Sequence, residues 1–265
     1  LYISSMTSSG VGSRIALQSN TKVYTLQPMP RDLCPHRGHA LQYSKCPYHG
    51  LTFPVPQGCF KQENVPRETT DDDWCEKIED DLGASFFTYD MPVKAPASLW
   101  IQNTMDCSHL ASVHADSLAR VFSSYTPHHV CINESGSSWR LSVKPEVVDV
   151  YRGIIGDGVG TEFFHAVSYP SLSITSFLDV FYSFETVKPG KTETRVRTVF
   201  HLSKKNPAPR PLIDAAIEMN KKILLEDRKV VESWAQTYED HKHVNFLKNE
   251  ERIQAYLGSP HCNHS

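Results

Sequence analysis

The chain has 265 residues, of which 40% are hydrophobic and 22% are charged, as is typical of a globular protein with one large domain or two smaller ones. Its formal net charge of -3 at pH 7 offers no basic surface to a nucleic acid backbone, which argues against a nucleic-acid-binding protein. No apolar run is long enough to span a membrane, and the N-terminal residues lack the apolar core of a secretory signal.

Residues 1–90 predict a small domain of short strands and loops. The segments SRIALQ (13–18) and KVYTLQP (22–28) alternate apolar and polar residues, and proline and glycine interrupt the pattern often. The acidic stretch RETTDDDWCEKIEDD (67–81) predicts an exposed loop.

Residues 91–265 predict a different kind of unit. The segment NTMDCSHLASVHADSLARVF (103–122) predicts a helix, with Asn103 as its N-cap and Asp106 at its third position. Strands are expected within residues 138–152, 161–187 and 193–203, and the longest helix at 207–241. The expected fold class is α+β, in which an N-terminal β domain precedes an antiparallel sheet with a long helix.

The cysteines carry information about the compartment. Cys34 and Cys46 share a motif, and the other five of the seven show no spacing typical of a disulfide framework: Cys59, Cys75, Cys107, Cys131 and Cys262. An odd number of scattered cysteines favours free thiols in a reducing compartment. We therefore expect a cytoplasmic protein, unless an organelle leader was removed before residue 1.

Two short loops each supply one cysteine and one histidine. CPHRG contains Cys34 and His36, and CPYHG contains Cys46 and His49. A zinc site of this composition usually takes both cysteines from one loop and both histidines from another. The mixed loops instead favour a dinuclear iron–sulfur cluster, in which two thiolates hold one iron and two imidazoles hold the other. A structural zinc knuckle or a packed Cys/His cluster is the alternative, and His39 is interpreted as a surface or supporting residue.

A second group of candidate ligands follows in the pattern Asp106-x2-His109-x4-His114. On an ideal helix, the five-residue step between the histidines turns the second about 140° away from the first. The two imidazoles therefore converge only if the helix is distorted or ends there. Without further information, they are equally well explained as core or surface residues.

The predicted long helix contains a carboxylate within its apolar stripe. Asp227 has apolar residues in the turn before it and in the two turns after it: Ile223, Leu224, Val230, Val231 and Trp234. A buried carboxylate is costly unless it is paired or bound to a metal, so Asp227 is either a metal ligand or the partner of a buried arginine. Glu226, beside Lys222 and Lys229, is expected to be solvated.

Together these motifs resemble a known family. CPHRG and CPYHG are similar to the Rieske iron–sulfur motif, and NTMDCSHLASVH and LLEDRKVVE resemble segments of the catalytic subunits of Rieske non-heme iron oxygenases. The resemblance extends over nearly the whole chain. It implies a Rieske domain at 1–90 and a catalytic domain with a helix-grip sheet at 91–265. It also implies a 2Fe-2S cluster and a mononuclear Fe(II), the first held by Cys34, His36, Cys46 and His49, the second by His109, His114 and Asp227.

The resemblance gives Asp106 a role other than metal binding. In the family, the acidic residue at this position links the mononuclear site to a cluster histidine on the neighbouring subunit of a homotrimer. The sequence alone offers an alternative, because a carboxylate in the first turn also complements the N-terminus of a helix.

The implied activity is that of an oxygenase. It would use dioxygen and electrons from a separate NAD(P)H-dependent reductase or ferredoxin to hydroxylate or demethylate a small organic substrate, aromatic or otherwise apolar. Aromatic residues that either line its pocket or belong to the core are Phe122, Tyr125, Phe163, Phe164, Tyr169, Phe177, Phe181 and Tyr182. Two other classes stay open, an electron-transfer protein and a zinc-stabilised binding module, and the metal content would distinguish them.

Overall fold

A computed structural model describes most of the C-terminal part of the chain and several short segments before it. The described residues are 16–19, 22–25, 34, 46–49, 67–68, 72–118, 120–132, 136–169, 171–190, 193–237, 252–253 and 256.

Within these residues the chain forms ten strands and five helices. The strands are β1 (Ala16–Ser19), β2 (Lys22–Thr25), β3 (Arg67–Glu68), β4 (Leu82–Val93), β5 (His129–Ile132), β6 (Gly136–Ser142), β7 (Glu162–Ser168), β8 (Leu172–Phe177), β9 (Phe181–Lys188) and β10 (Thr194–Ser203). The helices are α1 (Asp72–Asp81), α2 (Ala97–Met105), α3 (Leu110–Val113), α4 (Pro145–Ile155) and α5 (Arg210–Thr237).

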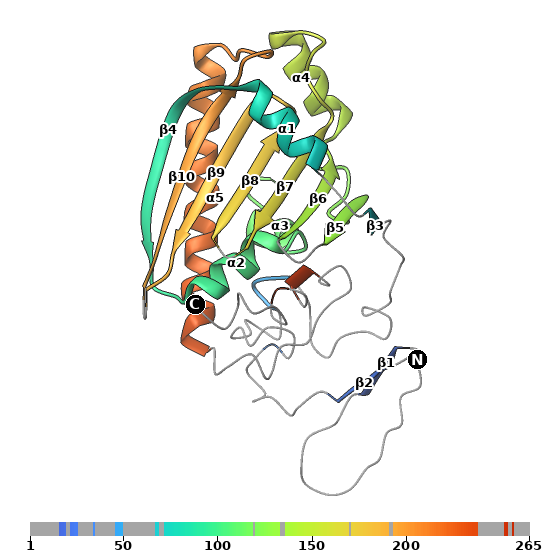
Figure 1. Ribbon diagram of the computed structural model, residues 1–265, viewed down its shortest axis with the longest axis vertical. Helices are drawn as coiled ribbons and strands as arrows, with labels where there is room; N and C mark the ends of the chain where they lie inside the picture. Colours follow the sequence, from blue (N-terminus) through green and yellow to red (C-terminus); the bar gives the residue numbers. More distant parts are fainter. Residues whose placement is uncertain are drawn as a thin grey trace, which may run out of the picture.

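One large sheet organises the C-terminal part of the chain. Its strand order is β3-β5-β6-β7-β8-β9-β10-β4, and each neighbouring pair is antiparallel except β3 and β5, which are parallel. Figure 1 shows α5 running along one face of this sheet and α1 crossing the other. This antiparallel sheet with its long C-terminal helix confirms the predicted α+β class for this part of the chain. Strands β1 and β2 form a separate antiparallel pair.

The core lies between α2, α5 and the side of the sheet that faces them. Trp100 of α2, Val196 of β10 and Val231 and Trp234 of α5 are each at most 1% exposed and belong to one apolar cluster. Alternate residues of β10 are buried, as expected for an antiparallel sheet in which one face packs on the core. This packing fixes α5 over the sheet.

Two predictions of local structure are wrong. Residues 72–81 form α1 rather than an exposed loop, because Ile78 is buried against Phe164 and Tyr182 on the sheet. A strand was expected within residues 138–152, but only its first part forms one, as the end of β6. Residues 145–155 form the helix α4 instead. The valines of this segment favour strands, but Pro145 in the first turn has the fixed φ that starts a helix.

The helix predicted for residues 103–122 is not continuous. Helix α2 begins earlier, at Ala97, and ends at Met105, and Asp106 then adopts an extended conformation with φ -90° and ψ 107°. Asn103 therefore lies in the last turn of α2 and is not an N-cap, and Asp106 does not lie in the first turn of a helix. The break satisfies the condition under which His109 and His114 can converge.

Two other predicted boundaries, that of the long helix and that between the domains, compare differently with the structure. The long helix predicted at 207–241 is α5, and residues 238–241 lie outside the described part of the chain. The predicted domain boundary between residues 90 and 91 falls within β4, which pairs with β10 along most of its length. Among the described helices, none combines the length and the apolar character that crossing a membrane requires.

Candidate metal centre

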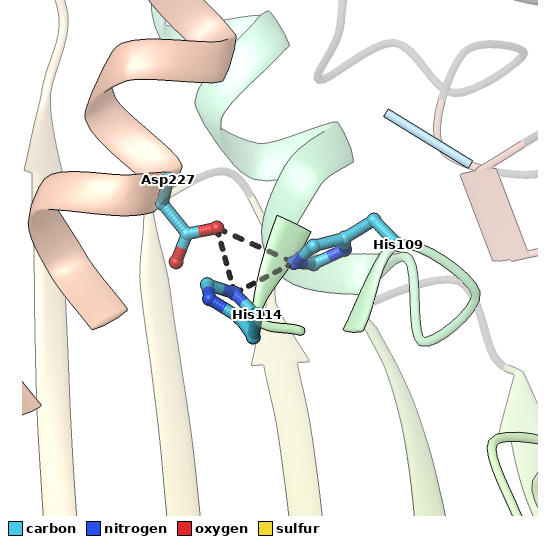
Figure 2. Close-up of side chains that lie close together, drawn as sticks. All are labelled: His109, His114 and Asp227. Carbon is cyan, nitrogen blue, oxygen red and sulfur yellow. Dashed lines mark hydrogen bonds and ion pairs between the residues drawn. The ribbon is translucent and has the colours of Figure 1, made fainter. Parts of the chain in front are cut away.

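Three side chains from two distant segments converge under α5. The Nε2 atoms of His109 and His114 lie 3.2 Å apart, and the Asp227 Oδ1 atom lies 3.3 Å from the first and 3.1 Å from the second. Figure 2 shows the two imidazoles and the carboxylate pointing toward one another. Donor atoms about 3 Å apart are the spacing expected of neighbouring ligands that bind one ion at about 2.0–2.2 Å. The two histidines and the carboxylate therefore fit the facial triad of a mononuclear iron.

The electrostatics of this group require a positive charge. Asp227 is 8% exposed, and although burial favours its protonated form, His114 and His109 lower its pKa below the ordinary value. Burial alone would lower the pKa of His114, but Asp227 and Glu226 raise it to about 9. In the absence of a metal, the carboxylates hold a proton on the imidazole. A divalent ion that binds the imidazole nitrogen would displace this proton and supply the positive charge instead.

Two further side chains orient the candidate ligands, and the sequence did not identify either. Asn103 Nδ2 donates a hydrogen bond of 2.9 Å to Asp227 Oδ1, from the last turn of α2. Glu226 Oε2 accepts from His114 Nδ1 at 2.8 Å and from the Ser117 hydroxyl at 2.7 Å. A hydrogen bond at Nδ1 fixes the imidazole orientation that leaves Nε2 for a metal.

The contact between Glu226 and His114 corrects the expectation that Glu226 is simply solvated. Its side chain is 20% exposed, and its Oε1 atom lies 3.9 Å from Lys222 Nζ, so one side of the carboxylate does face the surface. The other side faces His114. Neighbouring lysines are a signal of solvation, but they carry no information about a histidine 112 positions earlier in the chain.

Two of the predicted cluster ligands lie close together in the structure. Cys34 and Cys46 are fully buried and pack with Tyr48 against Val113 and Val230. The Cys34 side chain, together with contacts from His49, lowers the pKa of the Cys46 thiol to about 4 in spite of burial. A thiol with this pKa is a thiolate at neutral pH, the form that binds metal.

Of the four predicted cluster ligands, three are described. Cys34, Cys46 and His49 fit a thiolate and imidazole donor set for a metal cluster, whereas His36 and the neighbouring His39 lie outside the described residues. Cys107 and Cys131, two of the other predicted free thiols, are buried and form no disulfide.

Asp106 lies between the two groups of candidate ligands. Its Oδ2 atom accepts a hydrogen bond from His49 Nε2 at 2.7 Å, and its Oδ1 atom accepts one from the Ser108 amide at 2.8 Å. Asp106 is 1% exposed. The contact with His49 joins two residues of one chain, whereas the prediction placed it between neighbouring subunits. Tyr48 extends the connection, because its ring stacks on His109 at 5.3 Å with an interplanar angle of 6°.

A cavity of about 370 Å³ opens beside the triad, between the sheet, α4 and α5. His109, His114 and Asp227 form part of its wall. Of the predicted aromatic residues, five line it: Phe122, Phe163, Phe177, Phe181 and Tyr182. The lining does not include the other three predicted residues, Tyr125, Phe164 and Tyr169. It does include Trp139 and Tyr151, which the sequence analysis did not identify as pocket residues. A cavity of this size accommodates a small organic molecule.

A buried triad of two histidines and one carboxylate, under a long helix on an antiparallel sheet, fits the donor set of a mononuclear non-heme iron oxygenase. Residues 93–252 match the family model of the vanillate O-demethylase oxygenase C-terminal domain, and the chain belongs to this family. The match confirms the predicted class, a Rieske-type oxygenase.

Solved structures were also compared with this chain, and two of them share its fold. The chain is similar to the quaternary ammonium Rieske monooxygenase CntA in complex with inhibitor MMV12, with 15% identity, a TM-score of 0.52 and coverage of 92% of this chain and 80% of that chain. For a second structure of a quaternary ammonium Rieske monooxygenase, which gives insights into inter-subunit electron transfer, the TM-score is 0.51, with 15% identity over 92% of this chain and 81% of that one. NdmB from Pseudomonas putida CBB5 has 17% identity, a TM-score of 0.46 and coverage of 92% and 79%. Curated protein sequences gave no match.

Proposed function

We propose that this protein oxidises a small apolar organic compound, by hydroxylation or demethylation, with dioxygen and with electrons from a separate reductase or ferredoxin. The observation that carries this proposal is the position of the triad in the wall of the cavity. A substrate in the cavity would lie directly beside the three donor atoms, and the facial arrangement would leave other coordination positions open.

The metal ligands are proposed residue by residue. His109, His114 and Asp227 would hold a mononuclear iron, and a 2Fe-2S cluster would be held by Cys34, His36, Cys46 and His49. When bound, the two groups would supply dioxygen activation and electron transfer, which side chains cannot provide. We assign the cluster ligands to a Rieske domain, predicted at 1–90, and the triad to a catalytic domain, predicted at 91–265, which also includes the whole of β4 because this strand belongs to its sheet.

The protein itself would orient the metal ligands, connect the two metal sites and exclude water from the cavity. Glu226 and Asn103 would hold His114 and Asp227 in their binding orientations. Asp106 would connect the sites, because its carboxylate accepts the His49 N–H and it precedes His109 by three positions. The apolar cavity wall would keep bulk water away from the reacting groups. We further propose a homotrimer, in line with the inter-subunit electron transfer studied in the similar monooxygenase.

The test is metal analysis followed by turnover. Protein purified without oxygen should contain about three irons and two acid-labile sulfides per chain. With a generic ferredoxin and its reductase, it should consume dioxygen in response to a panel of methyl ethers, N-methyl compounds and aromatic acids. Zinc in place of iron, or iron without any substrate-dependent oxygen uptake across the panel, would contradict the proposal.

A further inference from the structure

The floor of the cavity consists of rows of side chains that run across the strands. Register pairs Phe163 with Phe177 and Phe177 with Phe181, so one row is entirely aromatic. Tyr151 of α4 covers this row, with its ring edge-to-face to Phe177 at 5.5 Å, and Phe122 meets Phe163 in the same way at 5.4 Å. This end of the cavity offers a substrate only apolar ring surfaces and one phenol.

Two residues further along each strand, the floor is polar but carries no positive charge. His165, Thr175 and Ser183 form one row across β7, β8 and β9. Burial lowers the pKa of His165 to about 3, so its imidazole is neutral at any physiological pH. This row can donate and accept hydrogen bonds but cannot neutralise an anion.

The last row lies beside the candidate metal centre and contains a carboxyl group. Ser173 and Thr198 flank Glu185, which is 7% exposed. Burial raises the pKa of Glu185 to about 7, although Trp100 Nε1 donates a hydrogen bond of 2.7 Å to its Oε1 atom and Thr198 one of 3.3 Å to its Oε2 atom. These donors are neutral and orient the carboxyl group without cancelling its charge, but with a pKa of about 7 it is partly protonated at neutral pH and offers a cation only a partial counter-charge.

No lysine or arginine lines the cavity among the residues that the structure describes. A buried arginine, Arg252, lies nearby, with its guanidinium carbon 5.4 Å from the Trp139 ring centroid and Nη2 3.3 Å from Cys107 Sγ. Arg252 packs against Trp139 and its charge also acts on His165, another wall residue, but Arg252 is not itself among the lining residues. A carboxylate bound over the aromatic row would therefore be desolvated without a cationic partner among the described lining residues, which carries a large penalty.

From this distribution of charge we infer that the cavity selects an uncharged substrate, a methyl ether or N-methyl compound with an apolar body, and rejects aromatic carboxylates. The inference deepens the proposed function and rests on it, since the cavity is taken to be the substrate site. It also separates this chain from the activity for which its family is described, because vanillate is an aromatic carboxylate. In the inferred pose, the apolar body lies on the row of Phe163, Phe177 and Phe181, and the methyl group lies toward the triad.

The test compares ligands of the same shape and different charge. The nitro group of 4-nitroanisole has the shape of the carboxylate of 4-methoxybenzoate but no net charge, and 4-methoxybenzylamine provides a cation of similar size. Dissociation constants are measured by equilibrium dialysis on the iron-loaded protein, independently of turnover. We expect 4-nitroanisole to bind at least about 100-fold more tightly than 4-methoxybenzoate, the scale set by burying a charge without a partner, and more tightly than the amine.

A variant tests the reason for this selectivity. Thr175→Lys places an ammonium group in the middle row, and Thr175→Met is a control of similar size without charge. The lysine variant should bind 4-methoxybenzoate at least about 10-fold more tightly than the methionine variant, because the acid now has a partner. Circular dichroism and thermal melting check that both variants fold, and Ser183→Lys with Ser183→Met repeats the comparison on the adjacent strand.

Several results would overturn the inference. These are binding of 4-methoxybenzoate as tight as that of 4-nitroanisole, tighter binding of the amine, no binding of 4-nitroanisole at its solubility limit, or no gain of acid binding in either lysine variant. Failure of the proposed function would look different. In that case 4-nitroanisole would bind with the expected preference, but no methyl ether would stimulate oxygen uptake in the reduced protein.

Discussion

Removing the hydrogen bond that His114 donates to Glu226 should weaken metal binding without abolishing it. Glu226→Gln keeps an oxygen that can accept from His114 Nδ1 but loses the negative charge, whereas Glu226→Ala loses both. Loss of an outer partner of a metal-bound histidine typically costs about 10- to 100-fold in metal affinity, or about 1.4–2.7 kcal/mol. The Glu226 side chain is 20% exposed, so solvent screens its charge. We therefore expect the loss of metal affinity to lie near the lower limit for Glu226→Gln and near the upper limit for Glu226→Ala.

The assay is anaerobic competition for Fe(II) between the protein and a chelator of known affinity, with the iron–sulfur cluster intact. Asp227→Ala is the positive comparison, since it removes a proposed ligand and should abolish mononuclear iron binding while the cluster remains. Glu218→Gln is the matched control on the same helix, because Glu218 is 74% exposed in its side chain and pairs only with Lys221 in the described structure. Iron affinity of Glu226→Ala within twofold of wild type, or an equal loss in Glu218→Gln, would refute the positioning role.

Three other predictions concern the cluster, the pH dependence and the link between the sites. Cys34→Ser should lose the red-brown colour and the acid-labile sulfide, and the protein should become less soluble because cluster binding and folding are coupled. His39→Ala should keep the colour, the sulfide and the solubility. A fully coloured Cys34 variant would contradict the cluster assignment. The pKa of His114 is raised from 6.5 to about 9 in the folded metal-free protein, so its stabilising effect is complete below about pH 6.5 and is lost as the pH rises through about 9. Urea unfolding of metal-free protein at pH 6, 8 and 10 should show this loss of stability, and the stability of a His114→Gln variant should lack it. For the same reason, Co(II) should bind more tightly at pH 9 than at pH 7, since the metal competes with the His114 proton. Asp106→Asn should keep both metal groups and nearly the same melting temperature, but it should slow the single-turnover oxidation of a pre-reduced cluster. Mixing Asp106→Asn chains with Cys34→Ser chains should restore partial activity only if electrons cross between subunits. Wild-type single-turnover kinetics with full iron content would reject a linking role for Asp106.

The position of Asp227 was predictable because its burial follows from local periodicity. Apolar neighbours one turn away on either side place it on the covered face of a long helix, and it is 8% exposed in the structure. The same pattern predicted the sheet-covering helix itself. Its partners were not predictable in this way, since Asn103 lies 124 positions earlier in the chain and nothing in its own segment indicates which helix it faces.

Local patterns failed where tertiary contacts decide the conformation. The valines of residues 145–155 favour a strand by propensity, yet they belong to a helix in which Val148 is buried and Val147 and Tyr151 line the cavity. The acidic segment of α1 looks solvated, yet Ile78 packs on the sheet and Asp81 accepts hydrogen bonds from Tyr182 of β9 and Ser203 of β10. In both cases the deciding contact is with strands distant in sequence.

The break after Met105 is the feature on which both candidate metal sites depend. A helix continuing through residues 106–114 would separate the two histidines by about 140° around its axis, and they could not share a metal. Because α2 ends and Asp106 is extended, the following loop turns His109 toward Asp227, and the Asp106 carboxylate turns toward His49. One short loop thus contacts both groups of ligands. The hydrogen bond from the Ser108 amide to Asp106 Oδ1 holds the carboxylate within this loop, so Asp106 stabilises the turn as well as contacting His49. Its substitution by asparagine, which retains an oxygen for the amide, is therefore the change that removes the charge while preserving the turn.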